Sequence, residues 1–273
     1  MPSRLGLIAG NGLFPGLVAR GARAQGVEVI AVAHEGETER SIETEVTSCT
    51  WVRVGQLGRI IETFRRAGCD HAVMAGGIGK ARLFGGFRPD LRGAALLARL
   101  RTLHDDKILR GIAEELEGEG IPVVESTRYM PELVPLPGLV VGRKLKGRER
   151  DDIAFGRRVA AAVGAFEIGQ TVVVRDGLVF AVEAVEGTDA AIRRGGALAR
   201  RGAVVVKASK PGQDLRFDVP AVGPATIAAM QESGATVLAV EARRSIFFER
   251  KLLERRAREA GISVVAFDPE ELP

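Results

Sequence analysis

The sequence predicts an α/β protein in which a Rossmann-like open parallel sheet domain is followed by a second, mixed α/β domain. In the first half of the 273 residues, short β-branched runs alternate with amphipathic stretches, which is typical of a parallel sheet covered by helices. A stretch with three prolines and no helical periodicity follows at 130–142. Beyond it, an Asp-Gly pair between two β-branched runs indicates an antiparallel hairpin.

The elements of the first half follow from hydrophobic periodicity, taken in chain order. Short runs of apolar and β-branched residues predict strands at 4–9, 28–33, 71–75 and 121–125. Apolar residues at helical spacing predict the helices between them, at 15–25, 57–67 and 105–117. Because ligands of such open sheets bind at the carboxyl ends of the strands, we look for binding residues directly after each strand.

The second half mixes both strand directions. The hairpin joins strands at 171–174 and 178–185 through Arg175-Asp176-Gly177. Further strands are predicted at 203–207, 236–240 and 262–267, and helices at 149–163, 226–233 and 246–260. The predicted domains are therefore 1–130 and 143–273, with 131–142 as a proline-rich linker.

Composition excludes several classes of protein. With 46% hydrophobic and 27% charged residues, the chain is expected to be globular, and no apolar run is long enough to predict a membrane span or a signal peptide. The 39 basic and 35 acidic residues are interleaved and only 5% of residues are aromatic, so nucleic-acid binding is not expected. Two cysteines and three histidines without metal spacing argue against disulfides and zinc.

Two glycine turns mark the first domain. Gly10-Asn11-Gly12 follows the first predicted strand, and Gly76-Gly77 follows the strand at 71–75. Such turns expose backbone N–H groups that can bind a phosphate, although an ordinary turn explains each of them equally well. The dinucleotide fingerprint is absent, since Phe14 and Pro15 occupy its later positions.

Charged residues gather in two segments of the second domain. At 182–189, strand alternation places one of the two glutamates toward the core, and Thr188 or Asp189 can cap the following helix. The segment 207–218 carries three cations, two acids and an amide without clear periodicity. We expect Lys207, Lys210 and Arg216 to bind phosphate oxygens there, and Asp214 or Asp218 to bind a divalent ion or to position water.

In these motifs, together with Asp105-Asp106, the chain resembles the LpxI family, the UDP-2,3-diacylglucosamine pyrophosphatases of lipid A biosynthesis. The resemblance covers the whole chain in order. It implies hydrolysis of the diphosphate of UDP-2,3-diacylglucosamine, dependent on Mg²⁺ or another hard divalent ion such as Mn²⁺, to give UMP and 2,3-diacylglucosamine 1-phosphate. It also implies a substrate held between a Rossmann-like domain and a catalytic domain.

One position departs from the family pattern. The family has Gly-Pro-Asp-Thr where this chain has Gly223-Pro224-Ala225-Thr226. A carboxylate there can ligate magnesium or orient water, and an alanine methyl cannot, so catalysis is expected to be impaired by a factor on the order of 10² to 10⁴. The alanine marks either an engineered substrate-trapping form or a natural variant in which another residue takes this role.

The resulting site prediction has three parts. The catalytic set is Ala225 (Asp in the family), Asp214, Asp218, Lys207, Lys210 and Arg216. The metal ligands are Asp189, Asp214 and Asp218. The substrate-binding set is Gly10, Asn11, Gly12, Gly77, Asp106, Gln170, Glu186, Thr188 and Gln213.

Two other functions stay open at this point. A non-catalytic nucleotide-binding or lipid-binding protein would keep both domains and lose the chemistry, which Ala225 permits. A dinucleotide-dependent oxidoreductase would use the glycine turns. We expect a cytoplasmic protein in peripheral contact with the inner membrane surface, because the substrate is a lipid, and a homodimer is the expected assembly.

Overall fold

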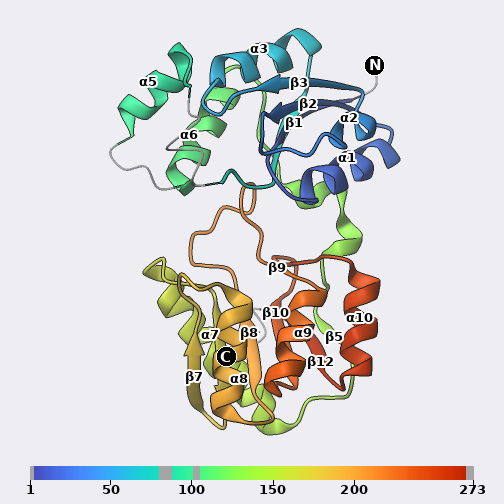
Figure 1. Cartoon of the computed structure of the whole chain (residues 1–273), viewed down its shortest axis with the longest axis vertical. Helices are drawn as coiled ribbons and strands as arrows, with labels where there is room; N and C mark the ends of the chain where they lie inside the picture. Colours follow the sequence, from blue (N-terminus) through green and yellow to red (C-terminus); the bar gives the residue numbers. More distant parts are fainter. Residues whose placement is uncertain (1–2, 80–87, 101–104, 269–273) are drawn as a thin grey trace. The chain divides into compact units, whose positions relative to one another are not determined.

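The computed structural model describes residues 3–79, 88–100 and 105–268. The chain forms two compact units, each with its own sheet (Figure 1). The first comprises Met1–Pro131 and Leu215–Phe217, and the second comprises Glu132–Asp214 and Asp218–Pro273. An open parallel sheet followed by a mixed α/β unit is the predicted fold class, which is confirmed.

The first unit is built on a four-stranded parallel sheet in the order β3-β2-β1-β4. Its strands are β1 (Arg4–Ala9), β2 (Glu28–His34), β3 (Ser48–Val52) and β4 (His71–Ala75). The central strand β1 lies between two neighbours, and its side chains Leu5, Leu7 and Ala9 are fully buried. The edge strand β3 was not predicted, because only Val52 of its five residues is buried and its alternation is weak.

Helices of this unit pack around the sheet and against one another. They are α1 (Phe14–Ala24), α2 (Ile42–Glu45), α3 (Leu57–Ala67), α5 (Leu91–Arg99) and α6 (Asp105–Gly118). In α3 the buried residues Leu57, Ile60, Ile61 and Phe64 form one stripe. The Phe64 ring lies against the backbone of β1, where a Cβ on Gly6 would be 2.8 Å from it.

The prediction of a strand at 121–125 is wrong, because this segment does not form a ladder with the sheet. Only one isolated parallel bridge joins Ala72 to Val123, and the 3-10 helix η1 (Ser126–Tyr129) follows. Pro122 has no N–H group to donate, which limits the length of the ladder beside β4. The segment from 131 to 142 contains a second 3-10 helix, η2 (Pro131–Leu133), and a strand, β5 (Gly138–Val141).

The second unit has a six-stranded mixed sheet in the order β5-β12-β10-β8-β6-β7. Besides β5, its strands are β6 (Thr171–Arg175), β7 (Leu178–Val182), β8 (Val204–Lys207), β10 (Val237–Glu241) and β12 (Ser263–Phe267). The three central strands are parallel. The predicted hairpin is present as β6 and β7, with Asp176 and Gly177 both at positive φ.

Four helices cover this sheet, namely α7 (Gly147–Ala165), α8 (Thr188–Ala199), α9 (Pro224–Ser233) and α10 (Arg250–Glu259). Val172, Val204 and Val206 pack on the side of α7, and Val173 and Val205 pack into the other core. The helix predicted at 246–260 begins only at Arg250, because Ile246–Phe247 forms β11, which pairs with β9 (Ala221–Val222).

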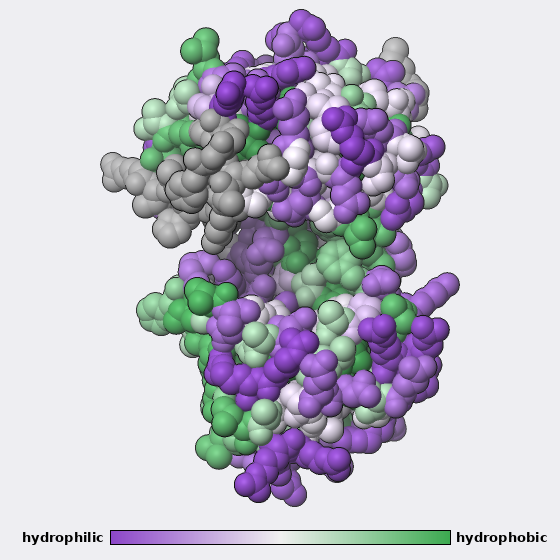
Figure 2. Space-filling view, viewed as in Figure 1, coloured by the Kyte–Doolittle hydropathy of each residue, from purple (hydrophilic) through white to green (hydrophobic). Residues whose placement is uncertain are grey.

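Polar side chains cover much of the surface, while apolar ones gather on the second unit beside β7 (Figure 2). Leu178 and Val179 of this edge strand are exposed. In the part of the chain that the structure describes, no helix combines the length and the apolar character that a bilayer span requires.

The two glycine turns of the first unit are bonded to each other. Gly10 donates its N–H to the Ala75 carbonyl at 2.8 Å, and Asn11 donates to Gly77 at 2.8 Å. The two turns lie too close together for side chains. A Cβ on Gly10 would lie 2.4 Å from the Gly77 carbonyl oxygen, and a Cβ on Gly76 would lie 2.4 Å from the Asn11 carbonyl oxygen. Adjacent strands β1 and β4 thus carry a rigid pair of turns at their carboxyl ends.

A matched pair of alanine substitutions tests this packing. Gly12 and Gly76 both have φ near +80°, but space around the Gly12 Cβ position is open whereas that of Gly76 is occupied by backbone. Gly12→Ala should lower the free energy of unfolding by about 1 kcal/mol, and Gly76→Ala by about 3 kcal/mol, because steric overlap adds to backbone strain. Urea denaturation measures both, and equal losses would contradict the close approach.

Candidate functional site

A row of buried polar side chains crosses three strands of the second unit. Thr171 of β6 faces Lys207 of β8 in the antiparallel register, and Glu183 donates its N–H to the Thr171 carbonyl at 2.8 Å. Strand alternation places Thr171 and Lys207 on the same face as Val173 and Val205, which belong to the core that α8 and α9 cover. Polar residues therefore occupy core-facing positions at the carboxyl end of β8.

The centre of this row is the Lys207 ammonium, whose residue is only 6% exposed. Its Nζ donates to Thr188 Oγ1 at 2.9 Å and to the Ala221 carbonyl at 2.9 Å. Thr188 Oγ1 in turn donates to Glu183 Oε1 at 2.8 Å. One continuous chain of hydrogen bonds thus joins the end of β7, the first residue of α8, the end of β8 and the start of β9.

Burial and charge act on this lysine in opposite directions. Removal from water lowers the pKa of Lys207, and the negative charges of Glu183, Asp189 and Asp218 act to raise it. Three buried oxygens, Gln170 Oε1, Thr171 Oγ1 and Glu183 Oε2, have no hydrogen-bond partner among the described residues. Hydrogen-bond acceptors therefore outnumber donors around the buried Lys207 ammonium.

Helices α8 and α9 present their N-termini at this same place. Lys207 contacts Thr188 at the start of α8 and the Ala221 carbonyl, three residues before α9. Near the other ends of the helices, a Cβ on Gly196 would lie 2.3 Å from Ser233 Oγ, so the two helices run parallel side by side (Figure 1). Both N-caps are glycines, so their first-turn N–H groups receive no side-chain cap from that position.

Ala225 occupies the second position of α9 and its side chain is exposed. The first turn of that helix contains no acidic residue. A carboxylate at 225 would therefore stand at the positive end of α9, four residues after the carbonyl that Lys207 binds.

The loop that follows β8 is held together by Gln213. The Lys210 N–H donates to Gln213 Oε1 at 2.8 Å, and Gln213 Nε2 donates to Asp218 Oδ2 at 2.7 Å. The Lys210 ammonium pairs with the exposed carboxylate of Glu167 at 2.7 Å. The structure thus brings Lys210, Gln213 and Asp218 together near the end of β8.

Arg216 lies in a different setting from the two lysines. Leu215–Phe217 belongs to the first unit, where Arg216 Nη1 donates to Glu117 Oε1 at 2.6 Å. Phe217 packs against the apolar cluster of that unit. Asp214 and Asp218, on either side of this tripeptide, belong to the second unit.

Of the two glutamates at 182–189, Glu183 is buried and Glu186 is exposed, as alternation predicts. Glu186 accepts from Arg194 at 2.5 Å and from the Ala184 N–H at 3.1 Å, and the hydrogen bond from Arg194 is the main reason that its pKa is lowered. Gln170 precedes β6, and its carbonyl accepts from the Ala208 N–H at 3.1 Å.

In the first unit the paired glycine turns are completed by an acid that the sequence did not reveal. Glu37 Oε2 accepts from Asn11 Nδ2 at 3.1 Å and from the Gly79 N–H at 2.9 Å. The Gly77 N–H donates to Asn11 Oδ1 at 3.3 Å. The side chain of Asp106, also predicted to bind substrate, lies outside the described residues.

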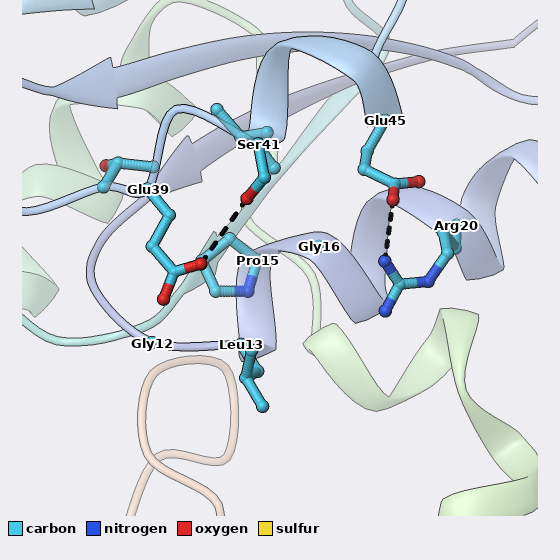
Figure 3. Close-up of a pocket in the computed structure, with 10 residues that line it drawn as sticks. Gly12, Leu13, Pro15, Gly16, Arg20, Glu39, Ser41 and Glu45 are labelled. Atoms are coloured by element: carbon cyan, nitrogen blue, oxygen red, sulfur yellow. Dashed lines mark hydrogen bonds and ion pairs between the residues drawn. The ribbon is translucent and has the colours of Figure 1, made fainter.

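A small cavity of about 130 Å³ opens next to Gly12 at the start of α1 (Figure 3). Ser41 donates to Glu39 at 3.4 Å on one side of it, and Arg20 pairs with Glu45 at 2.9 Å on the other. Of the predicted site residues, only Gly12 lines this cavity.

Thr171, Glu183 and Glu37 were missing from the predicted site. For the first two, a signal was present in the sequence, since they lie in phase with the apolar core residues Val173 and Ala181 of their strands. No such signal marks Glu37, because an acidic residue in a loop resembles any solvated loop residue.

Family models match both parts of the chain. The model described as the LpxI N-terminal domain matches residues 4–133, and the one described as the LpxI C-terminal domain matches residues 137–265. The UDP-2,3-diacylglucosamine pyrophosphatase LpxI of Caulobacter vibrioides is 34% identical over 282 residues, covering 99% of each chain.

Solved structures resemble the chain only weakly. The biotin carboxylase domain of a thermophilic 2-oxoglutarate carboxylase is 15% identical, with a TM-score of 0.28 over 63% of this chain and 35% of that one. For N5-carboxyaminoimidazole ribonucleotide synthetase from Thermotoga maritima, the identity is 17% and the TM-score 0.26, over 68% of this chain and 42% of that one. Similarity at this level establishes nothing about the site.

The position of Ala225 leads to a stability prediction. Ala225→Asp should raise the free energy of unfolding by about 0.3 to 1 kcal/mol, because its charge faces the positive end of α9. Ala225→Asn is the matched uncharged control and should give less than half of that gain. Urea denaturation at low and high salt measures both, and a gain that salt does not reduce would contradict the electrostatic origin.

Proposed function

The chain belongs to the LpxI family, and we propose from that premise that it hydrolyses the diphosphate of UDP-2,3-diacylglucosamine in lipid A biosynthesis, releasing UMP and 2,3-diacylglucosamine 1-phosphate. One observation carries the proposal for the second unit. Two parallel helix N-termini and a buried lysine converge at the carboxyl end of β8, which concentrates positive charge where a diphosphate would bind.

The residues of this site would act mainly by holding charge in place. First-turn N–H groups of α8 and α9 would donate to phosphate oxygens and stabilise the negative charge that develops as water attacks phosphorus. The bond from that phosphorus to the bridging oxygen breaks, so the leaving phosphate keeps the bridging oxygen. Attack at either phosphorus gives the same two products.

The residues present fit a magnesium ion that is bound in part by the substrate. Among the described residues, no three His, Cys, Asp or Glu side chains form a ready metal centre. Magnesium commonly takes only one or two protein carboxylates and fills its shell with water and substrate phosphates. Among the residues that the structure describes, the buried Glu183 Oε2 has no hydrogen-bond partner, and Asp189 and Asp218 act on the nearby Lys207 charge, so the donors are hard oxygens of the required kind.

We propose Asp189 and Asp218 as the carboxylates that would hold this ion, with Asp214, four residues before Asp218, as a further candidate. The ion, Mg²⁺ or Mn²⁺, would neutralise phosphate charge and polarise the phosphoryl oxygens. The half-buried Lys210 and the polar residues Gln170, Glu186, Thr188 and Gln213 would contact the substrate or brace residues that do. The turns with Gly10, Asn11, Gly12 and Gly77, and Asp106, are the proposed substrate contacts of the first unit.

Ala225 favours one second candidate function. A chain that keeps the anion site but lacks a carboxylate at the start of α9 would bind the nucleotide lipid without turning it over. Binding alone would suit a sensor or carrier of the lipid. The two functions differ only in turnover, and restoring the acid separates them.

The lipid part of the substrate also needs an apolar surface. Three large apolar side chains are exposed near this end of the row, namely Phe166, Ile168 and Val185. The two segments that carry them are in close contact, because a Cβ on Gly169 would lie 2.0 Å from the Glu183 carbonyl oxygen. Glu167, between the first two, has a φ of 58°, a strained conformation for a residue with a side chain. We propose that this apolar rim contacts the membrane surface and the acyl chains, because it adjoins Glu183 at the end of the row.

Release of UMP from UDP-2,3-diacylglucosamine is the first measurement. With Mg²⁺, the Ala225→Asp variant should turn over on the order of 10² to 10⁴ times faster than this chain, because it regains a carboxylate that can ligate metal or orient water. EDTA should abolish release by both. Fast turnover by this chain with no gain in the variant would show that another residue ligates the metal or orients the water.

A second measurement addresses the membrane contact. The double variant Phe166→Ser, Ile168→Ser should bind vesicles of phosphatidylcholine and phosphatidylglycerol at least tenfold more weakly, since it removes about 3 kcal/mol of apolar burial in the bilayer. Leu198→Ser, at the opposite end of α8 and similarly exposed, is the matched control and should bind as the parent does. Equal losses in both would place the contact elsewhere.

A further inference from the structure

We propose that Lys207 is a positioning residue: its ammonium fixes the starts of α8 and α9 relative to each other through Thr188 and the Ala221 carbonyl, and it does not ligate phosphate itself. The inference rests on the proposed function, because it concerns how the same anion site is held in shape. It differs from the direct phosphate contact that the sequence suggested for this lysine.

The first step is the commitment of the Lys207 donors. Two of the three ammonium protons point to protein acceptors, Thr188 Oγ1 and the Ala221 carbonyl, both at 2.9 Å. Only 6% of the residue is exposed. Lys210 offers a contrast within the same loop, since its ammonium lies nearer to solvent and pairs with an exposed glutamate. Of the two lysines, Lys210 has the accessibility that a phosphate ligand needs.

The second step concerns the direction of the Thr188 hydroxyl. Its proton goes to Glu183 Oε1, so its oxygen lone pair is turned toward the Lys207 ammonium. Glu183 is itself buried, and its other oxygen has no partner among the described residues. Each of the three groups needs the other two, because a buried charge without a partner costs several kcal/mol.

The third step follows the chain from these contacts. Thr188 is the first residue of α8, and Ala221 opens the short strand β9, which leads directly to the N-cap of α9 at Gly223. Lys207 therefore contacts both segments that set where the two helices begin. A displacement of one helix start by about 1 Å is sufficient to reduce a rate on the order of 10²-fold, so small shifts here would affect catalysis.

A double-mutant cycle tests this role in the Ala225→Asp background, where turnover is expected to be measurable. Lys207→Met and Thr188→Val each remove one side of the same contact without adding bulk. We expect each to lower kcat on the order of 10²-fold with KM changed less than threefold, and the double variant to be no slower than the slower single variant. Thr188→Ser keeps the hydroxyl and should restore kcat to within threefold of the parent.

Lys210→Met is the matched control for a direct phosphate contact. It should raise KM and make KM less sensitive to salt, because it removes an accessible charge. The proposal is overturned if Lys207→Met behaves like Lys210→Met, or if the losses of Lys207→Met and Thr188→Val multiply in the double variant. It is also overturned if Thr188→Ser is as slow as Thr188→Val.

Binding of inorganic pyrophosphate in the presence of Mg²⁺, measured by calorimetry, separates this inference from the proposed function. If the parent releases no UMP, the proposed hydrolysis fails, and the positioning role is decided by affinity for inorganic pyrophosphate. Lys207→Met and Thr188→Val should then bind within threefold of the parent while Lys210→Met binds more weakly, and a loss in Lys207→Met as large as that in Lys210→Met overturns the role. Should Lys207→Met fail to fold, Thr188→Val against Thr188→Ser decides alone.

Discussion

A charged ammonium group that is buried at the end of a strand must be surrounded by oxygen atoms, and the geometry of the second unit reflects that requirement. Lys207 meets it with a hydroxyl from α8 and a carbonyl from the chain before α9. Because desolvation of an ion is costly unless it is paired and hydrogen-bonded, neither partner can move away freely. The parallel arrangement of α8 and α9 brings two helix dipoles to the same lysine, so the same contacts that stabilise the buried charge also shape the proposed anion site.

The first unit reaches a comparable rigidity without any buried ion pair. Its two turns approach so closely that only hydrogen atoms fit at Gly10 and Gly76, and backbone hydrogen bonds join them directly. Glu37 then ties Asn11 to the backbone at Gly79. In one unit the ends of strands are positioned by a side-chain network, and in the other by the absence of side chains. Both devices place polar groups at the carboxyl ends of parallel strands, where such sheets bind their ligands.

Periodicity predicted the strands that carry the buried row and the hairpin with its Asp-Gly turn, because core-facing and solvent-facing residues alternate clearly there. It failed where pairing depends on distant segments. The edge strand β3 is mostly half-exposed, β9 and β11 have two residues each, and Pro122 leaves only a single bridge beside β4. Periodicity also could not predict the ion pair of Arg216, since its partner Glu117 is 99 positions away in the chain. The burial of Lys207 could be inferred from its phase with Val205, yet the identity of its oxygen partners depends on tertiary contacts.

The membership of Leu215–Phe217 in the first unit bears on the modularity of the protein. A chain cut after Pro131 would leave the first half without the Phe217 ring that packs on its apolar cluster, and would leave the second half with that ring exposed to water. The two halves therefore do not correspond to independent cassettes, although each has its own sheet. Exchange of one half between relatives by recombination would therefore have to preserve this tripeptide together with the apolar surface on which Phe217 packs.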